Sequence, residues 1–139
     1  MQYICLVYNE YDKLNALTDE ELTEHVGAVG AWVQQLEQDG RHVFSAGLQS
    51  PATAATVRIR GGALSVTDGP FAETKEVLGG FTILEARDLN EAIQLASKMA
   101  VPRIGTVEVR PLMDFAGDMP GKHEQRLSRI IRALNAPQA

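Results

Sequence analysis

The sequence predicts an α+β fold: a ferredoxin-like β-α-β-β-α-β domain with an antiparallel sheet, an inserted hairpin and an extra C-terminal helix. Two observations carry this prediction. Strand and helix patterns follow the split β-α-β order once a hairpin about Gly61-Gly62 is set aside. The helix patterns are apolar on one side only, which is typical of helices that cover one face of a sheet.

The first strand and the first helix have the clearest patterns. Residues 2–8 place apolar side chains on both faces of a strand. Thr18 and Glu21 have the spacing of a capping box, so a helix is expected to begin there. Its apolar stripe has spacings of four and three residues and ends before Gly40, the expected stop: Leu22, Val26, Val29, Val33 and Leu36.

The other elements of the domain follow in chain order: a strand at 42–49, a hairpin of 53–60 and 63–67, a strand at 81–86, a helix from Leu89 to Ala100 and a strand from Thr106 to Met113. Gly61-Gly62 is a favoured two-residue turn, and Pro102 blocks continuation of the helix. The buried stripe expected on this second helix is Leu89, Ala92, Ile93, Ala96 and Met99.

The tail is predicted to form a second unit, residues 114–139, after a domain of residues 1–113. A linker rich in Gly, Asp and Pro precedes a helix at 122–136. Its apolar stripe is Leu127, Ile130, Ile131 and Leu134, with Arg126, Arg129 and Arg132 along the other side. We expect the stripe to pack on the domain or on a partner subunit; a membrane or nucleic-acid arm is the alternative.

A homodimer is expected from the sheet pattern. With both helices on one face, the other face would expose strand residues such as Ile4, Leu6, Phe81 and Ile83. A second copy covers such a face most simply.

Composition excludes several classes of function. The chain has 139 residues, a formal net charge of −5 and one cysteine. An acidic chain is not expected to bind nucleic acid, and no apolar run is long enough to span a membrane. No signal peptide pattern opens the chain, so the cytoplasm is the expected location. Cys5 is expected to be a core residue, and no zinc spacing, phosphate loop or nucleophile elbow indicates a metal or cofactor.

The candidate site residues lie in two places. His25 borders the stripe of the first helix, on the side of Trp32, where an imidazole could act as a general acid or base or simply bind water. Asp68 opens a charged loop in which Phe71 is expected to be an apolar anchor, although this aspartate could instead cap its own turn. The candidate substrate-binding residues are Phe71, Glu73, Lys75, Glu76 and Arg110, of which Lys75 or Arg110 would hold the charge of a small, anionic substrate. Glu73 or Glu76 is the expected partner of Arg110, unless that side chain points to water.

The string Asp68-Gly69-Pro70-Phe71, with Glu73, Lys75-Glu76 and Gly79-Gly80 after it, resembles the signature of the DGPF-type, YCII-related family. The opening strand, the Ala46-Gly47-Leu48 step and Val107-Glu108-Val109-Arg110-Pro111 extend the resemblance over residues 1 to about 113. It implies a ferredoxin-like domain that pairs into a dimeric α+β barrel, without an assigned reaction. In the broader family an early helical histidine is proposed to pair with an aspartate, and His25 sits at the matching place.

Two functions are therefore expected as alternatives. One is a cofactor-independent enzyme that acts on a small organic acid or lactone through His25 and a carboxylate such as Asp68. The other is a non-catalytic binding or regulatory module. The resemblance implies a sigma-factor-linked partner for such a module, because DGPF-type proteins are often encoded beside, or fused to, alternative sigma factors.

Overall fold

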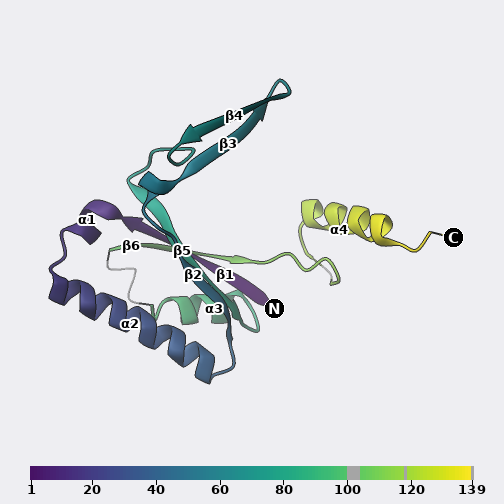
Figure 1. The fold of residues 1–139 in the computed structure, drawn as a ribbon. Helices are drawn as coiled ribbons and strands as arrows, with labels where there is room; N and C mark the ends of the chain where they lie inside the picture. The colour runs from purple at the N-terminus through teal and green to yellow at the C-terminus, as the bar shows by residue number, and fades with distance from the viewer. Residues whose placement is uncertain (100–103, 118, 139) are drawn as a thin grey trace.

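The computed structural model describes residues 1–99, 104–117 and 119–138. A four-stranded antiparallel sheet of order β2-β5-β1-β6 forms the centre, and β3 and β4 form a separate two-stranded hairpin (Figure 1). This strand order is that of a ferredoxin-like domain. The strands are β1 (Gln2–Glu10), β2 (His42–Gly47), β3 (Ala55–Arg60), β4 (Ala63–Asp68), β5 (Glu76–Glu85) and β6 (Gly105–Pro111). The helices are α1 (Tyr11–Asn15), α2 (Asp19–Gln38), the 3-10 turn η1 (Pro51–Thr53), α3 (Leu89–Ala96) and α4 (Lys122–Asn135).

The register of the strands defines two opposite ends of the sheet, which place the β3–β4 hairpin and α4. At one end Asn9 of β1 lies between Val77 and Gly105, where β5 and β6 begin. At the other end Tyr3 lies between Leu84 and Pro111. The β3–β4 hairpin precedes β5 and therefore belongs to the first end, whereas the chain leaves β6 for α4 at the second end.

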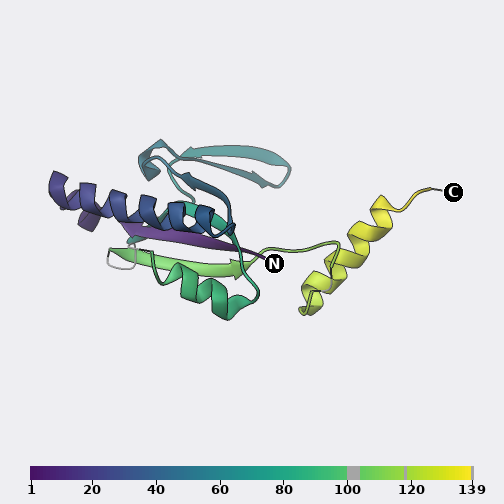
Figure 2. The same cartoon turned by 90° about the horizontal axis from the view of Figure 1, so that it is seen from below.

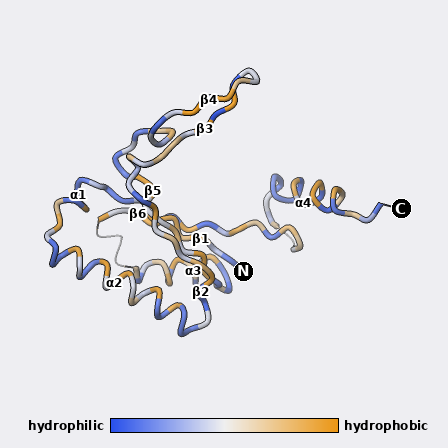
Figure 3. The backbone as a smooth tube through the Cα atoms, in the orientation of Figure 1, coloured by the Kyte–Doolittle hydropathy of each residue, from blue (hydrophilic) through white to orange (hydrophobic). Residues whose placement is uncertain are grey.

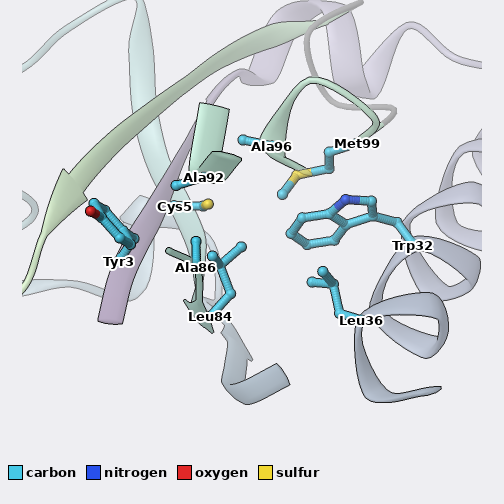
Figure 4. Packing of buried hydrophobic residues seen from close by; sticks show 9 residues of the cluster. All are labelled: Tyr3, Cys5, Trp32, Leu36, Leu84, Ala86, Ala92, Ala96 and Met99. Atoms are coloured by element: carbon cyan, nitrogen blue, oxygen red, sulfur yellow. The ribbon is translucent and has the colours of Figure 1, made fainter. Parts of the chain in front are cut away.

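Helices α2 and α3 lie on the same face of the sheet (Figures 1 and 2). Helix α2 begins with the predicted capping box, since Thr18 Oγ1 accepts from the Glu21 backbone and the Glu21 carboxylate accepts from the Thr18 backbone, each at 3.1 Å. The core lies between these helices and the sheet. Trp32 and Leu36 of α2 point toward Leu84 and Cys5 of the sheet, and Met99 lies beside Trp32 (Figure 4).

A buried carboxylate joins α3 to the strand side of the core. Glu91 is 7% exposed and forms ion pairs with Arg41 and Arg87. The hydrogen bond from Arg87, against the opposing effect of burial, holds the pKa of Glu91 below its usual value. Because a buried carboxylate is costly without such partners, these two arginines are part of what stabilises the α3 end of the domain.

The face of the sheet opposite the helices has no cover among the described residues. Its apolar side chains alternate with the buried ones: Ile4, Leu6, Tyr8, Phe44, Phe81 and Ile83. Phe44 and Phe81 are in contact, with ring centroids 6.0 Å apart, and Phe44 is still 54% exposed. This open face confirms the sheet pattern from which a dimer was predicted.

The β3–β4 hairpin and α4 both stand away from the core. The hairpin rises on the open-face side, and α4 continues beyond the other end of the sheet (Figures 1 and 2). Gly61 and Gly62 form the hairpin turn with φ of 57° and 78°, values that favour glycine. No described helix is long and apolar enough to cross a membrane.

Several sequence predictions are corrected in detail. Strand β5 begins at Glu76, five residues before the predicted start at Phe81, because Glu76–Leu78 pair with β1. A short helix, α1, occupies part of the predicted connection after the first strand. On α3, Leu89 and Ile93 are exposed, since only the Ala92–Ala96 side faces the sheet. The helix predicted to run to Ala100 ends at Ala96, with Ser97 as its C-cap, and the predicted block at Pro102 lies outside the described residues.

Candidate functional site

A pocket of about 330 Å³ lies between α2 and the sheet, at the end of the sheet where β5 begins. Helix α2 lines it with His25, Val26, Val29, Trp32 and Val33. The sheet lines it with Val7, Asn9, Ser45, Gly47, Gly80 and Thr82, among others. The C-terminal half of α2 packs tightly through Trp32 and Leu36, whereas Val26 in the N-terminal half is 60% exposed. The pocket therefore occupies the space that α2 leaves where it does not touch the sheet.

Glycines form the strand side of this pocket. Gly47 is paired with Gly80, and Gly79 is the next residue of β5. A Cβ on Gly80 would lie 2.8 Å from the Ala46 carbonyl oxygen, so the two strands approach closely here. A Cβ on Gly47 would meet nothing within 4 Å. The missing side chain of Gly47 thus leaves open volume, while that of Gly80 permits the close approach.

The polar groups of the pocket are few. His25 is half-buried, and it is the one ionisable side chain among the described residues that line the pocket. Ser45 Oγ and Thr82 Oγ1 lie 2.8 Å apart, and His42 Nε2 lies 2.8 Å from the same Ser45 oxygen. Asn9 completes the polar set. A mostly apolar pocket with a small number of placed polar groups is typical of a small-molecule site.

Trp32 fixes the inner wall of the pocket. Its indole Nε1 donates to the Leu95 carbonyl oxygen at 2.8 Å, and the side chain is 7% exposed. This hydrogen bond ties α2 to α3 and satisfies the polar end of a ring that otherwise packs in the core. Trp32 is also the only tryptophan of the chain, so its fluorescence reports directly on the pocket.

The structure separates most of the other predicted site residues from His25. Asp68 is exposed at the base of the hairpin, paired in register with Ala55, and Glu73 is exposed in the loop that follows. Phe71 is 78% exposed, so within one subunit the prediction that it anchors this loop is wrong. Among the described residues, no hydrogen bond or ion pair joins His25 to Asp68, Glu73 or Glu76. The pairing of His25 with one of these carboxylates stays a prediction.

The remaining loop charges are paired at the end of the sheet. Lys75 Nζ lies 3.5 Å from a Glu10 carboxylate oxygen, and Glu76 accepts from Thr106 Oγ1 at 3.0 Å. The hydrogen bond and charge of Lys13, with a smaller effect of Lys75, lower the pKa of Glu10. Arg110 lies on the open face with its Nε 3.5 Å from Glu108 Oε2. The prediction that Arg110 pairs with Glu73 or Glu76 is therefore wrong. Glu108 lies two positions away on the same face of β6 and is the nearer carboxylate.

Sequence reasoning missed the sheet side of the pocket. Ser45, Thr82 and Asn9 carry no motif, and Gly79-Gly80 precedes the predicted strand at 81–86 but lies within β5. One signal was present: Gly47 interrupts the predicted strand at 42–49, and glycine inside a strand often marks a close approach or a ligand. No group of three or more potential metal ligands occurs within the described ranges.

Comparison with known proteins places the chain in a family. The family model of the YCII-related domain matches residues 1–116. The uncharacterized protein R00369 of Rhizobium meliloti (strain 1021) is 36% identical over 123 residues, which cover 86% of this chain and 99% of that protein. Among solved structures, the 5-chloro-2-hydroxyhydroquinone dehydrochlorinase of Burkholderia phenoliruptrix AC1100, in complex with 2,5-dihydroxybenzoquinone, is similar with a TM-score of 0.49 and 14% identity, over 88% of this chain and 98% of that one. On the family match and the identity to R00369, the chain belongs to the YCII-related domain family.

Proposed function

We propose that this protein binds a small organic molecule in the pocket beneath α2 and that His25 transfers a proton to or from it. One observation carries the proposal: a half-buried imidazole is the only ionisable group in the described lining of a mostly apolar pocket. An ionisable side chain that lines a pocket is the usual candidate for a general acid or base.

The size of the pocket limits the ligand. An apolar cavity on the order of 150 Å³ holds one benzene-sized molecule. The pocket of about 330 Å³ therefore accommodates a single ring with several substituents, or an open chain of similar size. Ser45, Thr82 and Asn9 can hydrogen-bond to the carbonyl or hydroxyl groups of such a molecule, whereas the valines contact its apolar part. A small organic acid or a lactone fits this combination.

His25 can act without a cofactor. An imidazole accepts a proton in its neutral form and donates one in its charged form, so one side chain can serve as base and as acid. Asp68 is the proposed carboxylate partner: its hairpin leaves the sheet at the same end as the pocket, although it rises on the open-face side, so the pairing requires the hairpin base to approach His25 when a ligand or second subunit is bound. A carboxylate there would orient the imidazole and stabilise its charged form during proton transfer.

The working form of the protein is proposed to be a homodimer. The open face presents six apolar side chains, among them Phe44, Phe81 and Ile83, and Arg110 lies at its β6 edge beside Glu108. A contiguous apolar face of this kind is typical of a subunit interface. Light scattering at micromolar concentration should give a mass of twice 15.1 kDa.

A second candidate function is a binding module without catalysis. The observation that favours it is the internal pairing of the loop charges: Lys75 with Glu10 and Glu76 with Thr106. Charges used in this way are not available to a substrate. In such a module the same pocket would sense a metabolite, and the bound state would be transmitted to a protein partner of a sigma-factor system.

The fluorescence of Trp32 provides the test. A panel of single-ring acids and lactones is titrated into the wild type, and compounds that change the emission are incubated with the protein and followed by NMR. We expect His25→Gln to abolish conversion with binding reduced only modestly, and His123→Gln, an exposed histidine of α4, to behave as the wild type. Binding with no conversion of any compound would favour the module. Conversion that survives His25→Gln would refute the assigned role of His25.

A further inference from the structure

Helix α4 presents an apolar stripe that its own domain does not cover. Ile130 is 48% exposed and Leu134 is 78% exposed, although Leu127 and Ile131 on the same stripe are half-buried. The hydrogen bonds of α4 outside the helix go to its own linker. Ser128 and Arg132 donate to the Phe115 carbonyl oxygen at 3.3 Å, and Arg132 also donates to Gly117 at 3.0 Å. A helix of this length is marginal in water by itself, so the stripe needs a surface to pack on.

The β3–β4 hairpin presents a second uncovered apolar surface. Val57 is paired with Val66 and Ile59 with Leu64, and these four side chains share one face of the two-stranded ribbon. Each is between 61% and 75% exposed. The polar residues of the hairpin, including Arg58 and Ser65, alternate onto the other face. An isolated two-stranded hairpin is also marginal in water, so this face too requires a partner. Figure 3 shows apolar residues along both strands and along α4.

The positions of the hairpin and of α4 at opposite ends of the sheet indicate whether α4 can reach the hairpin of its own subunit or that of a second copy. The hairpin belongs to the end at Asn9, whereas the chain departs for α4 from the end at Tyr3. The hairpin rises on the open-face side (Figure 1). A two-fold axis that runs across the strands packs two open faces together and places each end of one sheet over the opposite end of the other. The hairpin of each copy then rises at the end where the other copy's α4 begins.

We infer that α4 of one subunit packs its apolar stripe on the hairpin face of a second copy, which is formed by Val57, Ile59, Leu64 and Val66. Two such α4–hairpin contacts, each called a clasp, would then hold the proposed dimer together. The length of the α4 stripe is similar to the size of the hairpin face. The stripe from Leu127 to Leu134 spans about 10 Å at 1.5 Å per residue. The hairpin face spans about 7 Å along the strands and about 5 Å between them. In this arrangement Arg126 and Arg129 point to solvent and away from the apolar contact.

The clasp goes beyond the function of the family domain, because the matched family region ends at residue 116 and α4 begins at Lys122. It also bears on the site. Asp68 ends the hairpin strand β4, and the charged loop follows it. A hairpin held by the second subunit would fix the position of this loop at the pocket end of the sheet, independently of which molecule the pocket binds.

Cross-linking between two variants that each carry one added cysteine tests the contact. Leu64→Cys and Ile130→Cys proteins are purified separately, refolded together from urea, and treated with a short bismaleimide. Native Cys5 gives little background because it is fully buried and burial raises the pKa of its thiol to about 11. We expect a product of twice the subunit mass from this mixture. The matched control is Ser65→Cys, on the opposite hairpin face, mixed with Ile130→Cys, and it should give a markedly lower yield.

Two results would overturn the inference. One is an equal yield from the Leu64 and Ser65 mixtures. The other is an internal cross-link in the Leu64→Cys/Ile130→Cys double variant with none in the mixture, which would place α4 on its own hairpin.

Dimer dissociation provides an independent measurement. Ile130→Asp introduces a charge into the stripe, and Gln125→Asp introduces the same charge on the opposite side of α4. Because the substitution is present in both clasps, we expect Ile130→Asp to raise the dimer Kd at least about tenfold. Gln125→Asp should leave it unchanged. Neither residue belongs to the core, so the unfolding midpoint of the domain reports whether a variant has remained folded. Equal Kd values for the two variants in folded protein would contradict the clasp.

Discussion

Two glycines on the strand side of the pocket should respond in opposite directions to the addition of one methyl group. Gly47 and Gly80 are paired across β2 and β5, so they share the same local sheet and the same face. A Cβ on Gly47 would enter open space in the pocket. A Cβ on Gly80 would lie 2.8 Å from the Ala46 carbonyl oxygen, which is a backbone atom held by the sheet and cannot move away cheaply.

The magnitudes follow from these two environments. Gly47→Ala removes conformational freedom from the unfolded chain without a clash and should raise the free energy of unfolding by about 0.4–1 kcal/mol. Gly80→Ala gains the same entropic term but forces β2 and β5 apart, and overpacking of this kind costs about 1–3 kcal/mol. Because the entropic gain is common to both variants, we expect Gly80→Ala to be less stable than Gly47→Ala by the overpacking cost, roughly 1–3 kcal/mol.

Urea unfolding followed by Trp32 fluorescence measures both variants, and an unchanged slope shows that the unfolded states are comparable. If Gly47→Ala destabilises the protein, or if Gly80→Ala leaves its stability unchanged, then the environments described for these two glycines on the strand side of the pocket are wrong. A larger substitution at Gly47 then tests the ligand site. Gly47→Leu should fill the pocket and abolish the Trp32 response to any compound that the wild type binds, while the protein remains folded.

Two further predictions concern the core. Glu91→Gln removes the charge that pairs with Arg41 and Arg87, and it should lower the free energy of unfolding by about 1–3 kcal/mol at neutral pH. The pKa of Glu91 is lowered in the folded state, so the difference in stability between wild type and Glu91→Gln is fully present above pH 4.5. It should shrink as the pH falls through the lowered pKa of Glu91. Urea unfolding of both proteins across acidic pH would measure this change. Cys5 is buried with its thiol pKa raised to about 11, so iodoacetamide at pH 8 should label it only after unfolding; rapid labelling of native protein would contradict its burial.

The elements that could be predicted from the sequence are those that local chemistry determines. The Thr18–Glu21 capping box involves side chains three residues apart, and the structure places it where the spacing indicates. The Gly61-Gly62 turn requires positive φ at both residues, which glycine supplies. The alternation of β1 gives one buried face and one open face. Each of these depends on residues within a few positions of one another, so a sequence pattern is sufficient.

The pocket could not be predicted because it depends on pairs far apart in the chain. Gly47 lies opposite Gly80 only through the β2–β5 register, and a bulge between His42 and Phe44 shifts that register. Trp32 is fixed by the Leu95 carbonyl, 63 residues away. The border position of His25 on α2 did follow from helical periodicity, and His25 lines the pocket. The missing information was which strand residues it would face.

The distribution of apolar surface links these results to the dimer. The predicted stripe of α2 is well buried only in its second half, and the pocket occupies the space beneath its first half. The open face, the hairpin face and the stripe of α4 are all apolar and all uncovered within one described subunit. A folded chain cannot leave three such surfaces in water without a tendency to associate. The proposed two-fold arrangement would cover all three at once, with the open faces in the centre and an α4–hairpin contact on each side. The pocket, on the opposite side of each sheet, stays accessible in that arrangement.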